Sequence, residues 1–192
     1  MKKEIHFAGI SGSLRKGSYN TLVLKNVVDL LPEDVSMEIL SFEDLPLYNA
    51  DYDIPASKER PPIVAGFRNK LAEADALVIV SPEYNYSLPG GLKNAIDWAS
   101  RGEDSPLLKK PVSVMGATTG MWGTTRMQLA FHSVFQFLNM QPVYKPEVLI
   151  AGAKEKFDSS GILKDEQTKD IIRKNLENLR QIVLHSLTLH TS

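Results

Sequence analysis

The segment Ala76–Val80 reads ALVIV and contains no polar residue. A strand with two apolar faces is typical of a parallel sheet that helices cover on both sides. Strand and helix patterns alternate before and after this segment along the whole chain. The sequence therefore predicts an α/β fold with a doubly wound parallel sheet of about five strands, in a single domain over residues 1–192.

The other elements are predicted from the spacing of apolar residues. The predicted strands are Ile5–Ile10, Met37–Leu40, Ala76–Val80, Val112–Met115 and one strand within Val143–Ile150. The predicted helices follow Thr21, cover Pro61–Ala74, begin near Leu92, and cover Thr125–Met140 and Glu166–Leu189, with Asp165 as the N-cap of the last. Ligands of such sheets bind beyond the carboxyl ends of the strands, in this chain at the loops Ser11–Thr21, Ser81–Pro89 and Gly116–Thr125.

Charge and cysteine content exclude several classes of function. The chain has 192 residues and a formal net charge of −1, so charge gives no indication of a nucleic-acid or membrane partner. It contains no cysteine, which excludes disulfides, thiolate nucleophiles and cysteine-ligated metals. The apolar stretch after Lys2-Lys3 is short and runs into a polar loop, and no apolar run reaches membrane-spanning length. We expect a cytoplasmic protein.

The loop ISGSLRKGSYNT, residues 10–21, joins the first strand to a helix. It lacks the Lys and Ser/Thr that a Walker loop carries after its second glycine, and Gly9, Gly12 and Gly17 do not have the Rossmann spacing. Its hydroxyls and the free N–H groups of a helix start suit a phosphate monoester, such as the one that ends FMN. The same residue types are also ordinary turn and cap residues, so the loop alone leaves both interpretations open.

The loop SPEYNYSLPGG, residues 81–91, follows the most apolar strand. Tyr84 and Tyr86 flank Asn85, and the backbone of Glu83–Ser87 offers hydrogen bonds to the pyrimidine edge of an isoalloxazine ring. The alternative is that these tyrosines only pack at the rim of the fold. Trp98, farther along, is expected in the core between helix and sheet.

Two stretches, GSLRKGSYN at residues 12–20 and PEYNYSLPGGLKNAIDW at residues 82–98, resemble the signatures of the flavodoxin-like NADPH-dependent FMN reductase family. The second is most similar to the soluble quinone/chromate reductase branch. LPLYNADYD at residues 45–53 and KPEVLIAG at residues 145–152 extend the resemblance over nearly the whole chain. The resemblance implies a five-stranded sheet in the order 2-1-3-4-5, bound FMN, and a homodimer or homotetramer.

The resemblance also implies the residues of an FMN site. On the phosphate side these are Ser11, Ser13, Arg15, Ser18, Asn20 and Thr21; around the ring they are Pro82, Glu83, Tyr84, Asn85, Tyr86 and Ser87. The third loop departs from the family pattern, because Thr124 replaces one of two paired glycines and the bulky Trp122 precedes it. Leu129 also stands where relatives often carry a polar aromatic residue, so the shape of the acceptor pocket and the subunit contact are left open.

The implied activity is hydride transfer from NADPH or NADH through FMN to a small acceptor: a quinone, an azo dye, a free flavin or a metal oxyanion such as chromate. Because the cofactor carries this chemistry, no catalytic side chain is assigned. Arg15 and Lys16 are candidates for the phosphates of NADPH, although a solvated cationic loop explains them equally well. A flavodoxin-type electron carrier is the alternative, and an FMN-binding regulatory module is a third.

Several residues are interpreted as structural. His6, His132, His185 and His190 lack the spacing of metal ligands, and no metal site is predicted. The pairs Glu43/Asp44 and Asp51/Asp53 lie in a proline-containing loop, where we expect solvated carboxylates rather than an acid–base pair. Four apolar residues, Met127, Phe131, Phe135 and Leu138, exceed what one narrow buried stripe requires and predict a subunit contact through this helix and the one beginning near Leu92.

Overall fold

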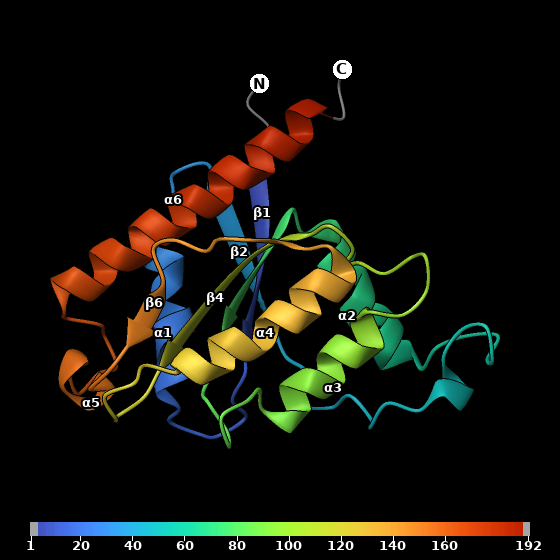
Figure 1. The fold of residues 1–192 in the computed structure, drawn as a ribbon, viewed down its shortest axis with the longest axis horizontal. Coiled ribbons are helices and arrows are strands. Elements are labelled where there is room, and N and C mark those ends of the chain that lie inside the picture. The colour runs from blue at the N-terminus through green and yellow to red at the C-terminus, as the bar shows by residue number, and fades with distance from the viewer. Residues whose placement is uncertain (1–3, 190–192) are drawn as a thin grey trace.

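The computed structural model describes residues 4–189 and contains one parallel sheet (Figure 1). Its strands are β1 (Ile5–Ser11), β2 (Val35–Leu40), β3 (Ala76–Val80), β4 (Pro111–Ala117), β5 (Gln141–Pro142) and β6 (Val148–Ile150). The order is β2-β1-β3-β4-β5, and β6 also pairs with β4. The predicted order 2-1-3-4-5 and the α/β class are therefore confirmed.

The fifth position of the sheet is filled by two short strands rather than one. β5 pairs with the start of β4, where Pro111 is opposite Gln141, and β6 pairs with its end, where Ala117 is opposite Ile150. The segment between them contains Pro146, which has no N–H to donate to a ladder. The strand predicted within Val143–Ile150 is thus only β6, and the pairing of β5 begins before that range.

Helices cover both faces of the sheet (Figure 1). They are α1 (Tyr19–Val27), α2 (Pro62–Glu73), α3 (Gly90–Ala99), α4 (Thr125–Leu138), the short α5 (Ala153–Lys156) and α6 (Glu166–Leu189), with 3₁₀ turns η1 (Val28–Leu30) and η2 (Ala50–Tyr52). One core cluster includes residues of α1 and α6, and the other includes residues of α2, α3 and α4. Within residues 4–189, no helix is long and apolar enough to cross a membrane.

Strand β3 contributes to both cores. Ala76, Val78 and Val80 lie in the cluster with α1 and α6, and Leu77 and Ile79 lie in the cluster with α2, α3 and α4. Successive side chains of a strand point to opposite faces, so an all-apolar strand needs cover on both. Full burial of a Val, Leu or Ile side chain is worth about 1.5–3 kcal/mol, which makes this strand a large contributor to the stability of the fold.

The apolar residues of α4 correct one prediction. Met127, Phe131, Phe135 and Leu138 are all buried within the chain, in the cluster that covers β3. They therefore cannot form the predicted subunit contact. The exposed apolar side chains of α4 are instead Leu129 (57%) and Phe137 (73%), which lie on its outer face.

The loop after β2 corrects another prediction. Asp53 is buried rather than solvated, because its Oδ1 accepts a 2.5 Å hydrogen bond from Nε of Arg60. The guanidinium of Arg60 also donates to Asp104, and this pairing lowers the pKa of Asp104. Nearby, Arg68 donates to four backbone carbonyls, among them those of Trp98 and Ala99 at the end of α3. Arg60 thus attaches the loop after β2 to Asp104, and Arg68 attaches α2 to the end of α3 and the segment after it.

Helix α6 begins at the predicted residue. Oδ1 of Asp165 accepts the backbone N–H of Thr168 at 3.0 Å and the ammonium group of Lys156 at 2.6 Å. The bonds from Lys156 and from the Thr168 hydroxyl lower the pKa of Asp165 from 3.8 to about 2. Asp165 is thus both the N-cap of α6 and an ion-pair partner.

The substitution Asp165→Asn tests the contribution of this charge, since asparagine caps a helix as well as aspartate. The folded-state pKa of about 2 lies below the ordinary pKa of 3.8, so the ionised carboxylate stabilises the fold above about pH 4 and loses this effect as the pH falls toward 2. For a partly exposed pair we expect about 1 kcal/mol, or 2–4 °C in Tm. Thermal unfolding should be measured from pH 7 to pH 3. The difference in Tm between the two proteins should shrink below pH 4, and a difference in Tm that stays constant would contradict a stabilising role for the charge of Asp165.

Candidate functional site

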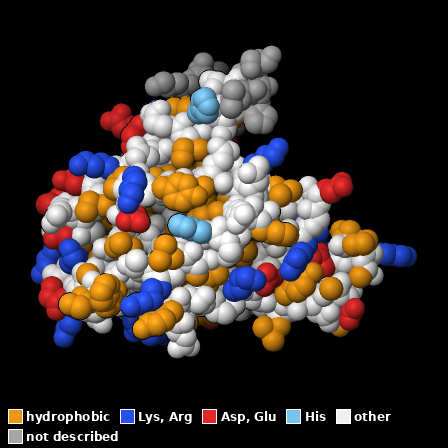
Figure 2. Space-filling model, in the orientation of Figure 1, with side chains coloured by type: hydrophobic (Ala, Val, Ile, Leu, Met, Phe, Trp, Pro, Cys, Tyr) orange, Lys and Arg blue, Asp and Glu red, His pale blue; other side chains and the backbone are white. Residues whose placement is uncertain are grey.

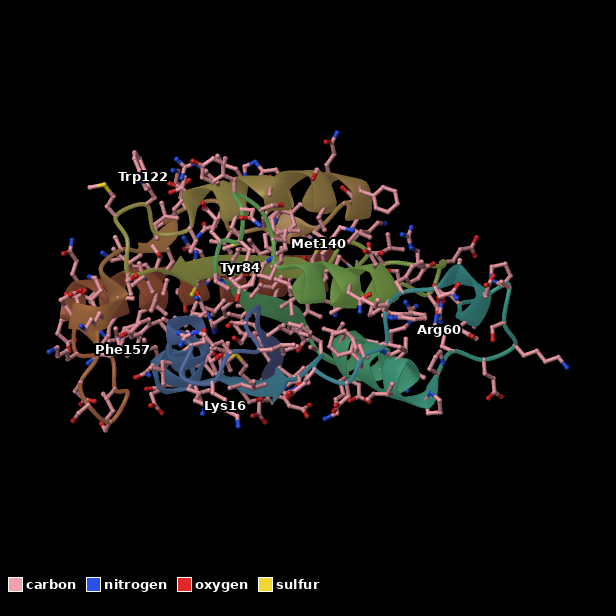
Figure 3. The ribbon with its side chains drawn as sticks, turned by 90° about the horizontal axis from the view of Figure 1, so that it is seen from below. Lys16, Arg60, Tyr84, Trp122, Met140 and Phe157 are labelled. Atoms are coloured by element: carbon pink, nitrogen blue, oxygen red, sulfur yellow. The ribbon has the colours of Figure 1, made fainter. Side chains whose placement is uncertain are left out.

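Three loops meet at the carboxyl edge of the sheet, after β1, β3 and β4. In Figure 3, Lys16, Tyr84 and Trp122, one from each loop, follow one another across this edge. The first two loops are in close contact: the Gly12 N–H donates to the carbonyl of Val80 at 2.8 Å, and a Cβ at Gly12 would clash with the side chain of Ser81. The expected convergence of the loops is therefore present.

The loop after β1 places hydroxyls around the start of α1. The hydroxyls of Ser11 and Thr21 are 2.8 Å apart, and the hydroxyls of Ser11 and Ser13 accept the N–H groups of Ser13 and Arg15 at 3.3 Å. Ser18 is the N-cap of α1 but makes no side-chain capping bond. The first N–H groups of a helix have no partner within it, so this loop joins hydroxyl and N–H donors in one place.

Arg15 and Lys16 lie on the exposed outer part of the loop. The Arg15 guanidinium donates to the carbonyl of Gly17 at 3.0 Å and more weakly to that of Lys16. Gly17 has a φ of +69°, a conformation that favours glycine and turns the chain into α1. Arg15 thus adds positive charge beside the hydroxyls, and its guanidinium stabilises the turn through these two hydrogen bonds.

Asn20 makes two hydrogen bonds within the chain that the sequence did not predict. Its amide donates to the carbonyl of Ala117 at 3.0 Å and accepts the N–H of the same residue at 2.8 Å. The side chain is buried, and both of its polar atoms are engaged with the end of β4. Asn20 therefore connects the start of α1 to the end of β4.

Residues 84–87 form a tight two-residue turn. Tyr84 and Ser87 exchange N–H···O bonds of 3.0 Å, with Asn85 at φ +50° and Tyr86 at φ +65° between them. Positive φ is common for asparagine but unusual for tyrosine, and strain of this kind concentrates at functional sites. Both tyrosines are exposed, Tyr86 to 68%, so neither belongs to the core. Trp98, by contrast, is fully buried as predicted.

Glu83 connects this turn to α4. Its Oε2 accepts the backbone N–H groups of Arg126 at 2.9 Å and Met127 at 3.2 Å, in the first turn of the helix. Its Oε1 lies 3.6 Å from the guanidinium of Arg126. That guanidinium lies 4.1 Å above the ring of Tyr86 and 5.3 Å from the ring of Trp122. No role for Arg126 was predicted, and its one sequence signal was its place after the glycine pattern of the third loop.

The third loop carries the departures from the family pattern. Gly123 and Thr124 both have positive φ, +56° and +68°, the latter unusual for a β-branched residue. Thr124 is buried, and its hydroxyl has no hydrogen-bond partner within residues 4–189. Trp122 and Leu129 are both exposed. Thr124, the residue that departs from the family's paired glycines, thus has a strained backbone and an unpaired hydroxyl. It lies near Gly116 and the carbonyl of Ser81, the residue after β3.

Metal chemistry has no support in the described part of the chain, where no group of three His, Cys, Asp or Glu side chains lies close enough to bind an ion. His132 contacts the edge of the Tyr144 ring, and His6 is within hydrogen-bond distance of Ser36. His190 lies outside the described residues.

Comparison with known proteins identifies the family. A family model described as NADPH-dependent FMN reductase matches residues 5–155. The chain belongs to this family. It is 42% identical over 180 residues to an NAD(P)H-dependent FMN reductase of Pseudomonas aeruginosa, covering 94% of this chain and 96% of that one. It is 38% identical over 172 residues to the quinone reductase of Escherichia coli K12, covering 88% and 90%.

Solved structures agree with this assignment. The flavoenzyme NAD(P)H:(acceptor) oxidoreductase FerB from Paracoccus denitrificans superposes with a TM-score of 0.84 at 28% identity, covering 94% of this chain and 98% of that one. The predicted family, the oxidoreductase class and FMN as the family's cofactor are confirmed.

The residues present fit FMN. A phosphate monoester matches the neutral hydroxyls, the free N–H groups of α1 and the nearby Arg15. The turn at residues 84–87 and the unpaired hydroxyl of Thr124 lie at the adjoining strand ends, where a flat polar ring would find both apolar surface and hydrogen-bonding groups.

Proposed function

We propose that this protein uses bound FMN to oxidise NADPH or NADH and to reduce quinones or similar small acceptors, such as azo dyes, free flavins or metal oxyanions. The observation that carries this proposal is the contact between the hydroxyl-rich loop before α1 and the beginning of the loop that carries the exposed turn at residues 84–87, where Gly12 lies against Val80 and Ser81. One loop suits the phosphate of FMN and the other suits the ring. The family membership reported above supports the same chemistry.

The phosphate end of FMN is assigned to Ser11, Ser13, Ser18 and Thr21, together with the first N–H groups of α1. Arg15 supplies positive charge from the exposed part of the loop. Asn20, from the predicted set, is assigned a supporting role because its amide is bonded to Ala117. Hydrogen bonds to a charged group contribute more than those to neutral groups, about 1.5–3 kcal/mol each, so this loop supplies much of the affinity.

The ring end is assigned to the segment Pro82–Ser87. Its backbone supplies hydrogen-bonding groups, and Tyr84, Asn85 and Tyr86 border the ring. When bound, FMN accepts hydride from the nicotinamide and passes electrons on to the acceptor. The chain itself holds the ring against the ends of β3 and β4 and shapes the space beside it. Because both tyrosines are exposed, they suit the border of an open acceptor pocket better than a closed sandwich.

The visible spectrum of the FMN-loaded protein tests the activity. Addition of NADPH or NADH without acceptor should bleach the flavin absorbance, and air or a quinone should restore it. A flavodoxin-type carrier would stay yellow after the addition, and that outcome would overturn the proposal. Comparing the bleaching rates with the two dinucleotides would measure the co-substrate preference.

The substitution Ser13→Ala tests the phosphate assignment. Loss of one hydrogen bond to a charged group should weaken FMN binding about 10- to 150-fold, whereas riboflavin, which lacks the phosphate, should bind almost unchanged. Quenching of flavin fluorescence measures both affinities. Asn20→Ala is the matched contrast, because its loss should lower the free energy of unfolding by about 1–3 kcal/mol through the unpaired groups of Ala117. Equal losses of FMN and riboflavin affinity in Ser13→Ala would refute the assignment.

We propose further that the protein is a homodimer or homotetramer and that it works in the cytoplasm. The face that carries α4 shows hydrophobic side chains scattered among polar and charged ones (Figure 2). On α4 itself Leu129 and Phe137 are exposed, which is unusual for large apolar side chains of an outer helix unless they meet a partner. Light scattering at micromolar concentration should give a mass of at least twice 21.4 kDa, and Leu129→Glu with Phe137→Glu should reduce it. A 21.4 kDa particle for the unaltered protein would exclude self-association.

A further inference from the structure

The carboxylate of Glu83 joins two loops of the candidate site that are otherwise separate in sequence. It lies in the loop after β3, one residue before the turn at residues 84–87. Its Oε2 accepts two N–H groups of the first turn of α4, from residues 43 and 44 positions later. Thr124, the N-cap of α4, makes no side-chain capping bond. Glu83, which is distant in sequence, therefore caps α4 and holds the start of this helix against the loop after β3.

The same carboxylate sets the position of a cation. Its Oε1 lies 3.6 Å from the guanidinium of Arg126, and the central carbon of that guanidinium lies over the ring of Tyr86 at 4.1 Å and over that of Trp122 at 5.3 Å. Arg126 thus lies beside two aromatic rings as well as beside the carboxylate of Glu83. The charge of Glu83 and the stacking on Tyr86 together hold Arg126 at the exposed mouth of the site.

We infer that Glu83 is a positioning residue for the acceptor pocket: it acts through Arg126 and the start of α4, and its side chain touches neither flavin nor acceptor. This inference rests on the proposed function and refines it, because the predicted set placed Glu83 among the residues that frame the ring. Its backbone remains in that set. Its carboxylate fixes the spacing between Tyr86 and the third loop, and hence the width of the pocket beside the ring.

Glu83→Gln separates capping from charge, because the amide oxygen still accepts the two N–H groups but no longer attracts Arg126. We expect Tm to change by less than about 2 °C and the FMN dissociation constant by less than about twofold, while the KM for quinone rises about two- to fivefold at nearly constant kcat. Glu83→Ala loses the cap as well, so its Tm should also fall by about 2–4 °C.

Asp165→Ala is the matched control, because it removes a helix cap and an ion pair at α6, far from these loops in sequence. It should lower Tm like Glu83→Ala and leave KM unchanged. The single variant Arg126→Gln and the double variant Glu83→Gln/Arg126→Gln complete a double-mutant cycle with Glu83→Gln. If Glu83 acts through Arg126, the two effects on KM should not add.

A measurement on the FMN-free protein provides an independent readout. Of the two tryptophans, Trp98 is fully buried and Trp122 is exposed next to Arg126. Iodide should quench the fluorescence of Glu83→Gln differently from that of the unaltered protein, and Trp122→Phe should abolish the difference. This arm involves no flavin and no substrate, so it stays informative if the spectral test refutes the proposed activity.

Two results would overturn the inference. Unchanged KM and unchanged quenching in Glu83→Gln, with only a lower Tm in Glu83→Ala, would show that Glu83 is a helix cap and nothing more. A loss of FMN affinity of tenfold or more in Glu83→Gln would show that the side chain contacts the cofactor directly.

Discussion

The fold depends on the burial of β3 on both faces. A strand with apolar side chains on each side is stable only between two layers, and the chain supplies α1 and α6 for one and α2, α3 and α4 for the other. Because β1 and β3 pair in parallel, their carboxyl ends lie at one edge, and their loops contact each other there. The candidate site is therefore a consequence of how the core is covered.

Side chains from one loop that bond the backbone of another hold the site together. Asn20 on α1 bonds both polar groups of Ala117 at the end of β4, and Glu83 bonds the start of α4. A buried N–H or carbonyl without a partner costs about 1–3 kcal/mol, so each of these bonds prevents a sizeable loss. The stability of each loop thus depends on the others, although dozens of residues separate them in sequence.

Periodicity was sufficient to predict the layers, because strand and helix spacing is a local property of the sequence. The all-apolar β3 and the start of α6 at Asp165 are examples. The partners of polar side chains were not predictable in this way. Asn20 finds Ala117 at a separation of 97 residues, and nothing local distinguishes an amide that will bind a ligand from one that will bind a strand.

Local sequence patterns also could not predict which polar side chains are buried, or how many apolar residues of a helix the core covers. Asp53 looks like an ordinary loop carboxylate, and only the folded chain brings Arg60 to it. The apolar residues of α4 resembled a contact surface because the width of the neighbouring core could not be known. The third loop shows the opposite case: Thr124 was recognisable because it departs from the paired glycines of the family that the chain resembles, and the structure gives that position a positive φ and a hydroxyl with no partner among the described residues.

The close approach at Gly12 has a consequence for how this site can evolve. A side chain at position 12 would overlap Ser81, and one at Gly116 would overlap the hydroxyl of Thr124 and lie 2.6 Å from the carbonyl oxygen of Ser81. Position 12 therefore shares its space with the side chain of Ser81, and position 116 shares its space with Thr124 and with the backbone of residue 81. Because a backbone carbonyl is present whatever residue stands at position 81, only glycine fits at position 116, whereas a side chain at position 12 would become possible only with a smaller residue at position 81.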